Sequence, residues 1–465
     1  MLFQSPAILT AILKPVCDFS LLDANGQDMS DEAMKRALID LAPAVVLITA
    51  LTVESQAQAH HCAKLAKEAL PESTVVMGGG YPTLCDTECI EDTNVDYIFL
   101  GHAEERADAF VTALLDGDDV RSMDGVGYRD GNGVRINPLK TYLHDVKKLV
   151  DPDYSLWDLR PYIETPVVKG TFLPFPEYSD TRVMTISTSY GCPYNCNFCA
   201  SRILCGGHIV FRPLDSVIRE IEYFIEKYGV RGLETYDDNI LFDRARFKKL
   251  FTTLESRGHQ MTWWLQNSSV PFMDDDIIEF AKAHGCCHVT LPVESGCERT
   301  LRDIIGKPYH DLNKVLHIVS KCHEVGLEVT GAFIIGFPGE TWDEIRSSLA
   351  FAEKCGFDNL QINIAQVYPK TRLYDTAVEM GLLPNGFRFR DFEYVGFGAA
   401  MLETDQFAKT ELEILRAFEW DRINFSTPEK KAKVASYHGL TPDEMDDYRR
   451  KARRSLGLFQ VKDRG

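Results

Sequence analysis

The chain has 465 residues, a formal net charge of −19 and 45% hydrophobic residues, which allows about three packed domains. The acidic balance argues against duplex nucleic-acid binding, because such proteins carry a basic surface. No run reaches the ~18 apolar residues of a membrane span, and no basic flank precedes the apolar start, so we expect neither a membrane protein nor a signal peptide. Thirteen cysteines without a regular framework indicate a reducing compartment, here the cytoplasm.

The first 150 residues alternate strand-like and helix-like segments. Short apolar runs at 44–49, 74–77 and 96–100 predict buried strands, and an apolar face at 56–70 predicts a helix between the first two. This βαβ order indicates a parallel sheet. Gly78–Gly80 follows the second strand, where glycines let a ligand approach the backbone or simply form a tight turn. The chain contains no G-x-G-x-x-G, so no dinucleotide site is expected.

Residues 151–181 are rich in prolines and aromatic residues, which predicts a linker. The strand–helix alternation then resumes over 182–380. Strands are expected at 183–188, 230–236, 261–265, 287–293, 327–335 and 361–367. Six parallel strands predict an open (β/α)6 partial TIM barrel, whose functional residues lie at the strand C-termini. Residues 381–465 predict a small helical C-terminal domain, and its basic residues 449–454 are interpreted as a solvated helix face. The fold class is thus α/β, with boundaries at 1–150, 151–181, 182–380 and 381–465.

A cysteine-rich loop directly follows the first strand of the expected barrel. Cys192, Cys196 and Cys199 form C-x3-C-x2-C. Cysteine thiolates at such short spacings hold iron–sulfur clusters, usually four to a cubane. Three thiolates would leave one iron open to a small molecule. The spacing alone also permits a zinc site, with Cys205 or His208 as the fourth ligand.

With Phe198 as its aromatic residue, the loop resembles the C-x3-C-x-aromatic-C signature of the radical S-adenosylmethionine enzymes. The resemblance implies that the three cysteines hold a [4Fe–4S] cluster and that the open iron chelates S-adenosylmethionine. One electron then releases a 5′-deoxyadenosyl radical. It also implies an external electron donor of the flavodoxin or ferredoxin type. An open-iron cluster is sensitive to oxygen, so the enzyme is expected to function under anaerobic conditions.

Polar motifs at the later strand ends resemble those of the same family. Singly, a strand-end acid is more often a helix cap and Pro-Gly is more often a turn, but these motifs occur in the family's order. The resemblance implies an S-adenosylmethionine site made of Phe198, Asp237, Asp238, Asn239, Gln266, Glu294, Ser295, Gly336, Ala365, Gln366 and Val367.

The N-terminal region is similar to the Rossmann-like cobalamin-binding domain that precedes many of these barrels. The D-x-H-x-x-G motif that supplies a histidine to cobalt is missing, which implies cobalamin without a protein axial ligand above the loop Leu51–Val53. The implied cobalamin site consists of Asp23, Leu51, Thr52, Val53, Ser55, Gly78, Gly79, Gly80, Tyr81, Thr83, Gly101 and Glu104.

These resemblances predict a cobalamin-dependent radical methyltransferase that acts on an unactivated sp3 carbon. The compact architecture is similar to peptide- and protein-directed members, such as those that methylate a glutamine of methyl-coenzyme M reductase. The alternatives are a cyclase or oxidoreductase that uses the same cofactors on a small molecule, and a non-catalytic iron–sulfur or zinc protein. No catalytic acid or base is identified, and Tyr190, Tyr236, Trp420 and Arg422 are assigned to packing.

Overall fold

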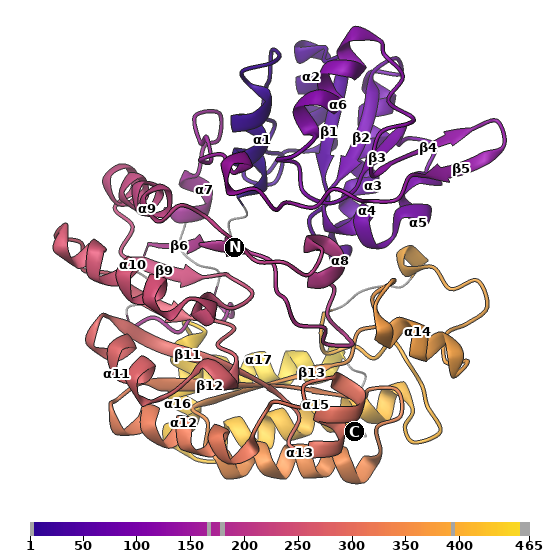
Figure 1. Cartoon of the computed structure of the whole chain (residues 1–465). Coiled ribbons are helices and arrows are strands. Elements are labelled where there is room, and N and C mark those ends of the chain that lie inside the picture. Colours follow the sequence, from indigo (N-terminus) through magenta and orange to yellow (C-terminus); the bar gives the residue numbers. More distant parts are fainter. Residues whose placement is uncertain (1–3, 165–168, 177–181, 392–395, 456–465) are drawn as a thin grey trace, which may run out of the picture.

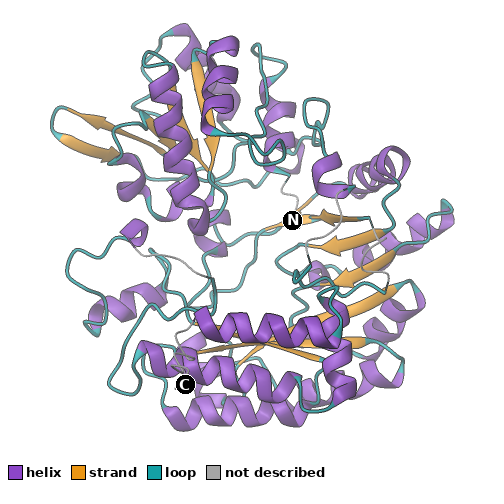
Figure 2. Cartoon of the chain, turned by 180° about the vertical axis from the view of Figure 1, so that it is seen from behind, coloured by secondary structure: helices purple, strands orange, loops and turns teal. Residues whose placement is uncertain are grey.

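The computed structural model describes residues 4–164, 169–176, 182–391 and 396–455 (Figure 1). Two separate β-sheets, each covered by helices, form the upper and lower parts of the molecule, and the short helix α8 (Ser201–Cys205) lies where they meet (Figures 1 and 2). Residues 165–168 and 177–181 of the expected linker lie outside the described residues. The rest of the linker contains the short helix α7 (Arg160–Ile163) and places Tyr154 and Trp157 in the barrel core.

The N-terminal sheet has five strands in the order β1-β2-β3-β4-β5. Its parallel strands β1 (Val45–Thr49), β2 (Thr74–Gly78) and β3 (Tyr97–Phe99) confirm the three expected strands. An antiparallel hairpin of β4 (Val126–Asp130) and β5 (Gly133–Ile136), which was not predicted from the sequence, extends the sheet beyond β3. The helices of this part are α1 (Ser5–Leu13), α2 (Asp31–Leu41), α3 (Gln56–Ala69), α4 (Gly80–Leu84), α5 (Asp86–Ile90) and α6 (Ala107–Asp116).

The second sheet has six strands in the order β13-β12-β11-β10-β9-β6, all parallel, which confirms the open partial barrel. Its strands are β6 (Val183–Ile186), β9 (Gly232–Thr235), β10 (Thr262–Leu265), β11 (Cys286–Glu294), β12 (Glu328–Ile335) and β13 (Asn359–Ile364). The helices around it are α9 (Leu214–Tyr228), α10 (Arg244–Ser256), α11 (Asp275–Ala283), α12 (Leu312–Glu324), α13 (Trp342–Cys355) and α14 (Arg372–Glu379).

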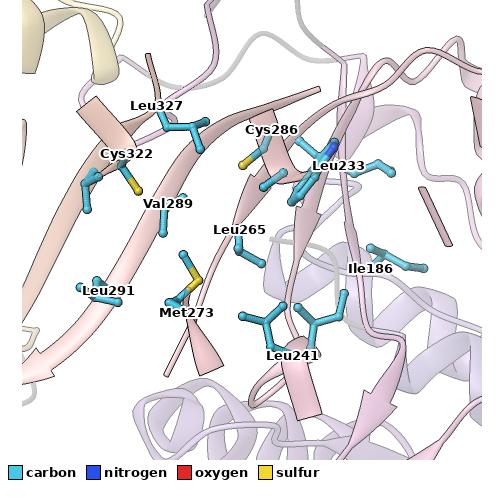
Figure 3. Packing of buried hydrophobic residues seen from close by; sticks show 14 of the residues in the cluster. Ile186, Leu233, Leu241, Leu265, Met273, Cys286, Val289, Leu291, Cys322 and Leu327 are labelled. Atoms are coloured by element: carbon cyan, nitrogen blue, oxygen red, sulfur yellow. The ribbon is translucent and has the colours of Figure 1, made fainter. Parts of the chain in front are cut away.

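The barrel core lies between this sheet and its helices. Leu233, Leu265 and Val289, from three neighbouring strands, are almost fully buried and belong to one cluster (Figure 3). Cys322 of α12 lies in the same cluster, at the side of β11. Burial of one such side chain contributes about 1.5–3 kcal/mol. The parallel strands therefore lie in a fixed register, and their polar C-terminal residues meet at one edge.

The barrel remains open, and helix α15 (Lys409–Asn424) covers its β13 edge. The Asn424 amide pairs with the backbone of Leu360, accepting from its N–H at 2.8 Å and donating to its carbonyl at 2.9 Å. Arg416 Nε donates to the Ile362 carbonyl at 2.9 Å. The side chains of Asn424 and Arg416 thus form hydrogen bonds with backbone groups of β13 that would otherwise be free to pair with a seventh strand.

Helices α16 (Pro428–Tyr437) and α17 (Pro442–Ser455) follow α15 and pack against one another. Their positions agree with the expected C-terminal helices. Among the described residues, no helix combines the length and the apolar character needed to cross a membrane.

Candidate active site

The loop with the three cysteines leaves the barrel through a tight turn. After β6, the two-residue strand β7 (Ser189–Tyr190) pairs with β8 (Val210–Phe211), and Gly191 follows with φ +87°. A Cβ at Gly191 would lie 2.1 Å from the His208 carbonyl oxygen. Only glycine therefore fits between β7 and the first cysteine.

Further along, the loop is held against the later parts of the barrel. Asn197 donates from its backbone N–H to the Ile305 carbonyl and from its side chain to the Ile304 carbonyl, each at 2.9 Å. Ile304 and Ile305 end the π-helix η5 (Thr300–Ile305), a rare element that is frequent at functional sites. Helix α14 adds a further contact, because Leu373 N–H donates to the Asn197 carbonyl at 2.8 Å.

All three cysteine side chains of the loop are half-buried and reduced. Burial raises the pKa of Cys192 to about 11 and that of Cys199 to about 12. These groups are therefore thiols at neutral pH in the cluster-free protein, and iron binding must displace their protons.

The zinc alternative finds no matching ligand set in the part of the chain that the structure describes. No three Cys, His, Asp or Glu side chains there are grouped closely enough to hold one metal ion. The proposed fourth ligands have other contacts: Cys205 Sγ lies 3.5 Å from His102 Nε2, and the His208 ring lies 4.2 Å from that of His144. The three free thiols lie on one loop at the short spacing that is typical of iron–sulfur ligands, which favours the cluster over zinc.

Asp237, Asp238 and Asn239 follow β9 in direct succession but have different contacts. Asp237 is buried and accepts hydrogen bonds from the Thr188 hydroxyl at 2.9 Å and the Ser189 hydroxyl at 2.5 Å. It therefore holds the start of the cysteine loop. Asp238 accepts from the Ser201 hydroxyl at 3.0 Å and lines a cavity. Asn239 caps the next turn, while its buried Nδ2 has no protein partner and can donate to a ligand.

Glu294, at the end of β11, has an unusual backbone conformation and a charged partner. Its φ is +67°, a region that only a few per cent of non-glycine residues occupy and that is enriched at functional sites. Lys307 Nζ lies 2.7 Å from the Glu294 carboxylate, and both side chains are at least 90% buried. The ammonium also lies 5.9 Å from the centre of the Phe198 ring. The pair therefore places a positive charge between Glu294, one of the expected S-adenosylmethionine residues, and the cysteine loop.

Lys307 was not among the site residues predicted from the sequence. The available signal was its place after Gly306, in the segment that follows the VESG strand end. A lysine is almost never fully buried unless it is paired. Its burial therefore depends on a partner that is 13 residues away in sequence, which no local pattern predicts.

The other expected S-adenosylmethionine residues lie at the C-terminal strand ends, mostly in contact with protein groups. Gln266 donates to Glu234, and Ser295 shares a 2.8 Å hydrogen bond with Ser348. Gly336 has φ +82°. Ala365 and Val367 are buried. Gln366 donates to two backbone carbonyls, but its buried Oε1 has no partner and can accept from a ligand.

A cavity of about 400 Å³ lies between the N-terminal sheet and the barrel. The lining includes seven of the residues expected to bind cobalamin, namely Leu51, Gly78, Gly79, Gly80, Thr83, Gly101 and Glu104. Tyr190, Gly191, Tyr236 and Asp238 line it from the barrel. One space thus contacts both the glycine turn of β2 and the start of the cysteine loop.

The other five expected cobalamin residues do not line this cavity. The Asp23 carboxylate accepts hydrogen bonds from Trp157 Nε1 at 2.7 Å and the Tyr162 hydroxyl at 2.8 Å. Val53 and Tyr81 are buried in the domain core. The remaining two are Thr52 and Ser55. These residues therefore support the fold around the cavity or lie beside it.

A further part of the cavity wall was not predicted from the sequence. Ile8 of α1 and Phe110 and Val111 of α6 contribute apolar surface. The apolar start of the chain was expected not to be a signal peptide and was given no role in a site, although its apolar residues form one wall of this cavity. A glycine rim with an apolar wall can contact part of a large, partly apolar cofactor such as cobalamin, although a cavity of about 400 Å³ does not enclose the whole molecule.

His102 joins the two domains at the cavity wall. Its ring contacts Cys205 of α8, and its Nδ1 lies 3.6 Å from the Glu104 carboxylate. Burial alone lowers the pKa of His102, but the contacts with Cys205 and Glu104 outweigh it and raise this pKa to about 10. The imidazole is therefore protonated at neutral pH.

Comparison with known proteins gives two family matches. Residues 186–352 match the Radical SAM superfamily, and residues 7–111 match the B12 binding domain. These ranges contain the cysteine loop with four of the later strand ends and most of the cavity-lining residues of the N-terminal part.

Relatives and solved structures extend the similarity over most of the chain. A protein named uncharacterized methyltransferase from Pyrococcus horikoshii is 28% identical over 381 residues, which cover 81% of this chain and 78% of that protein. Cytidylyl-2-hydroxyethylphosphonate methyltransferase of Streptomyces wedmorensis is 24% identical over 440 residues, with 88% and 81% covered. The structure of TsrM from Kitasatospora setae, a radical S-adenosylmethionine methyltransferase, shares the fold with a TM-score of 0.74 at 15% identity, covering 97% and 96% of the chains. The chain therefore combines a radical S-adenosylmethionine domain with a B12-binding domain and is similar over most of its length to proteins named as methyltransferases, and its cofactors are a [4Fe–4S] cluster, S-adenosylmethionine and cobalamin.

Proposed function

We propose that this enzyme transfers a methyl group to an unactivated sp3 carbon. The supporting observation is the shared cavity, which Gly78–Gly80 line from the N-terminal domain and Tyr236 and Asp238 line from the barrel. When bound, cobalamin supplies a transferable methyl group, and S-adenosylmethionine at the cluster supplies a 5′-deoxyadenosyl radical. Both must reach the same carbon, which requires a fixed geometry between the two domains.

The residues of the barrel edge hold S-adenosylmethionine in this proposal. Cys192, Cys196 and Cys199 bind the cluster. Glu294 accepts hydrogen bonds from the ribose hydroxyls, and the unpaired groups of Asn239 and Gln366 bind the methionine and adenine ends. A pre-formed polar rim of this kind orients the ligand without a large rearrangement of the protein.

The substrate in this proposal is a residue of a peptide or protein, and a glutamine of methyl-coenzyme M reductase is the candidate. Small molecules form the competing class, since the relative from Streptomyces wedmorensis is named for a cytidylyl phosphonate. The proposal also requires a one-electron donor of the flavodoxin or ferredoxin type.

The test is an anaerobic reaction of the protein reconstituted with cluster and cobalamin. Candidate glutamine peptides are incubated with reductant and S-adenosylmethionine that carries a deuterated methyl group, and products are analysed by mass spectrometry. We expect 5′-deoxyadenosine and a peptide that has gained one deuterated methyl group on carbon. Methylation of a small molecule alone would refute the peptide assignment but support the reaction type.

The matched control replaces all three cluster cysteines by alanine, and Cys297→Ala serves as the cysteine control outside the loop. The triple variant should lose iron and both products, whereas Cys297→Ala should retain them. A product that loses hydrogen and gains no methyl group would contradict methyl transfer and favour the cyclase or oxidoreductase alternative.

A further inference from the structure

A tyrosine contacts one of the cluster cysteines directly. The Tyr309 hydroxyl lies 3.7 Å from Cys196 Sγ, within hydrogen-bonding distance for sulfur. Tyr309 follows η5 and Lys307, in the same segment that holds the cysteine loop by the contacts to Asn197. This hydroxyl is therefore fixed relative to Cys196 by the fold.

Aromatic packing holds the Tyr309 ring in place. The Tyr194 ring stacks on it with a centroid distance of 4.6 Å and an interplanar angle of 25°. Tyr194 in turn packs against Phe242 at 5.7 Å and Phe272 at 6.5 Å. Such aromatic pairs contribute about 0.5–1.5 kcal/mol beyond the area they bury. The hydroxyl can therefore be removed from Tyr309 without removing the contacts that position its ring.

The direction of this hydrogen bond is determined once a cluster is bound. A cysteine that ligates iron is a thiolate and can only accept, so the Tyr309 O–H must donate. A tyrosine hydroxyl has an ordinary pKa of about 10, so it carries its proton at neutral pH and can donate.

The other two cysteines have a different kind of donor. Cys199 Sγ accepts from the backbone N–H of Ser201 at 3.5 Å. Cys192 likewise has a hydrogen bond with the backbone of Tyr194. Backbone donors cannot be removed by a side-chain substitution. Among the described residues, the hydrogen bond of Tyr309 to Cys196 comes from a side chain, so a substitution can remove it.

We propose that Tyr309 is a positioning residue that sets the reduction potential of the cluster. Hydrogen bonds to cluster sulfurs withdraw electron density and favour the reduced state. The bond to Cys196 therefore raises the potential and makes it easier for the cluster to accept one electron from its external donor. The step itself is the transfer of one electron, in which the donor is oxidised and the cluster is reduced, and Tyr309 keeps its proton.

The test compares wild-type protein, Tyr309→Phe and Tyr194→Phe, each reconstituted with its cluster. Both variants keep an aromatic ring, but only the first removes the hydroxyl at Cys196. A redox titration followed by electron paramagnetic resonance should give a lower midpoint potential for Tyr309→Phe and the wild-type value for Tyr194→Phe. Iron content per chain should be equal in all three. An unchanged or higher potential in Tyr309→Phe, or an equal shift in both variants, would overturn the proposal.

A second measurement does not depend on the potential. In deuterated water, pulsed electron–nuclear double resonance of the reduced wild-type cluster should detect an exchangeable deuteron that Tyr309→Phe loses and Tyr194→Phe retains. If all three proteins give the same deuteron couplings, no Tyr309 hydrogen bond reaches the cluster. Neither measurement uses a substrate, so the outcome is independent of the proposed carbon methylation.

Discussion

Glu340 is a carboxyl group that burial keeps from ionising. It lies in the GFPGE turn after β12, and its Oε2 accepts from the backbone N–H groups of Gly336 and Phe337 at 2.7 and 3.1 Å. Burial raises its pKa from 4.5 to about 8, although both hydrogen bonds act in the opposite direction. Between these pH values the folded state holds a proton that the unfolded state has lost, so stability falls as pH rises.

We expect Glu340→Gln to remove this pH dependence. The stability difference between wild type and variant should change by at most ~1.4 kcal/mol per pH unit between pH 4.5 and 8, with the variant relatively more stable at the upper end. Anaerobic urea unfolding at several pH values measures the difference.

Glu344 is the matched control, because the pKa of its carboxyl group is shifted in the opposite direction. The hydrogen bond from Arg299 lowers the pKa of Glu344 to about 2. The stabilisation from a lowered carboxyl pKa is lost only as pH falls from 4.5 toward 2. Glu344→Gln should therefore keep most of the slope between pH 4.5 and 8, since burial is the largest cause of the raised Glu340 pKa and the Glu344 charge adds only a smaller contribution. An unchanged slope in Glu340→Gln would contradict the assignment.

For individual residues, the polar residue types at the strand ends were predictable from the sequence, but the contacts that each side chain makes were not. The motif D-D-N marks the end of β9, yet Asp237 holds backbone, Asp238 faces the cavity and Asn239 caps a turn. These differences depend on partners such as Thr188, 49 residues away in sequence. A one-dimensional pattern does not specify such pairs.

The turn between β2 and α4 also requires glycine, at two successive positions. A Cβ at Gly79 would lie 2.4 Å from the Ala50 carbonyl oxygen, and one at Gly80 would lie 2.2 Å from that of Leu51. At Gly78 the nearest atom would be 3.6 Å away. The first glycine therefore leaves space on the cavity side, whereas the other two allow the turn to touch the loop after β1.

Gly80→Ala should destabilise the cofactor-free protein by about 1–3 kcal/mol, because a rigid backbone carbonyl would have to move. Gly131→Ala is the control, since a Cβ there meets no atom within 4 Å. Thermal unfolding should show a lower midpoint for Gly80→Ala and an unchanged one for Gly131→Ala. Equal stability of the two variants would show that the turn can adapt.

The elements themselves were largely predictable from hydrophobic patterning. Each strand of the barrel appears close to its expected place, with ends displaced by up to three residues. The hairpin β4–β5 was missed because its strands are short and partly polar. The π-helix η5 was also missed, since its geometry depends on contacts with the cysteine loop rather than on local propensity.

At the scale of the whole molecule, residues 368–370, which follow β13, connect the barrel to the N-terminal domain through hydrogen bonds and an ion pair. Lys370 Nζ donates to the Thr83 carbonyl at 2.5 Å and lies 2.7 Å from the Asp86 carboxylate. The Tyr368 hydroxyl donates to Glu54 at 2.7 Å. Because Thr83 also lines the cavity, this contact links the position of the barrel to the shape of the cofactor site.

Lys370→Met should weaken domain contact and speed the release of bound cobalamin. Hydrogen bonds to charged groups contribute about 1.5–3 kcal/mol, and each ~1.4 kcal/mol corresponds to a tenfold change. Stopped-flow displacement measures the release rate. Lys35→Met is the control, because its 3.5 Å ion pair with Glu68 lies on the surface of one domain and contributes little. Equal release rates in both variants would show that the Lys370 contacts do not hold the site.

Helix α15, which covers the β13 edge of the barrel, restricts how an extended peptide can bind to the enzyme. Many proteins capture peptides by adding them as a further strand to a free sheet edge. On this flank, however, Asn424 and Arg416 already occupy the backbone groups that such a guest would need. A polypeptide substrate therefore cannot add a strand along β13, and at this flank only its side chains and local shape are available for recognition, as in a loop or a folded turn.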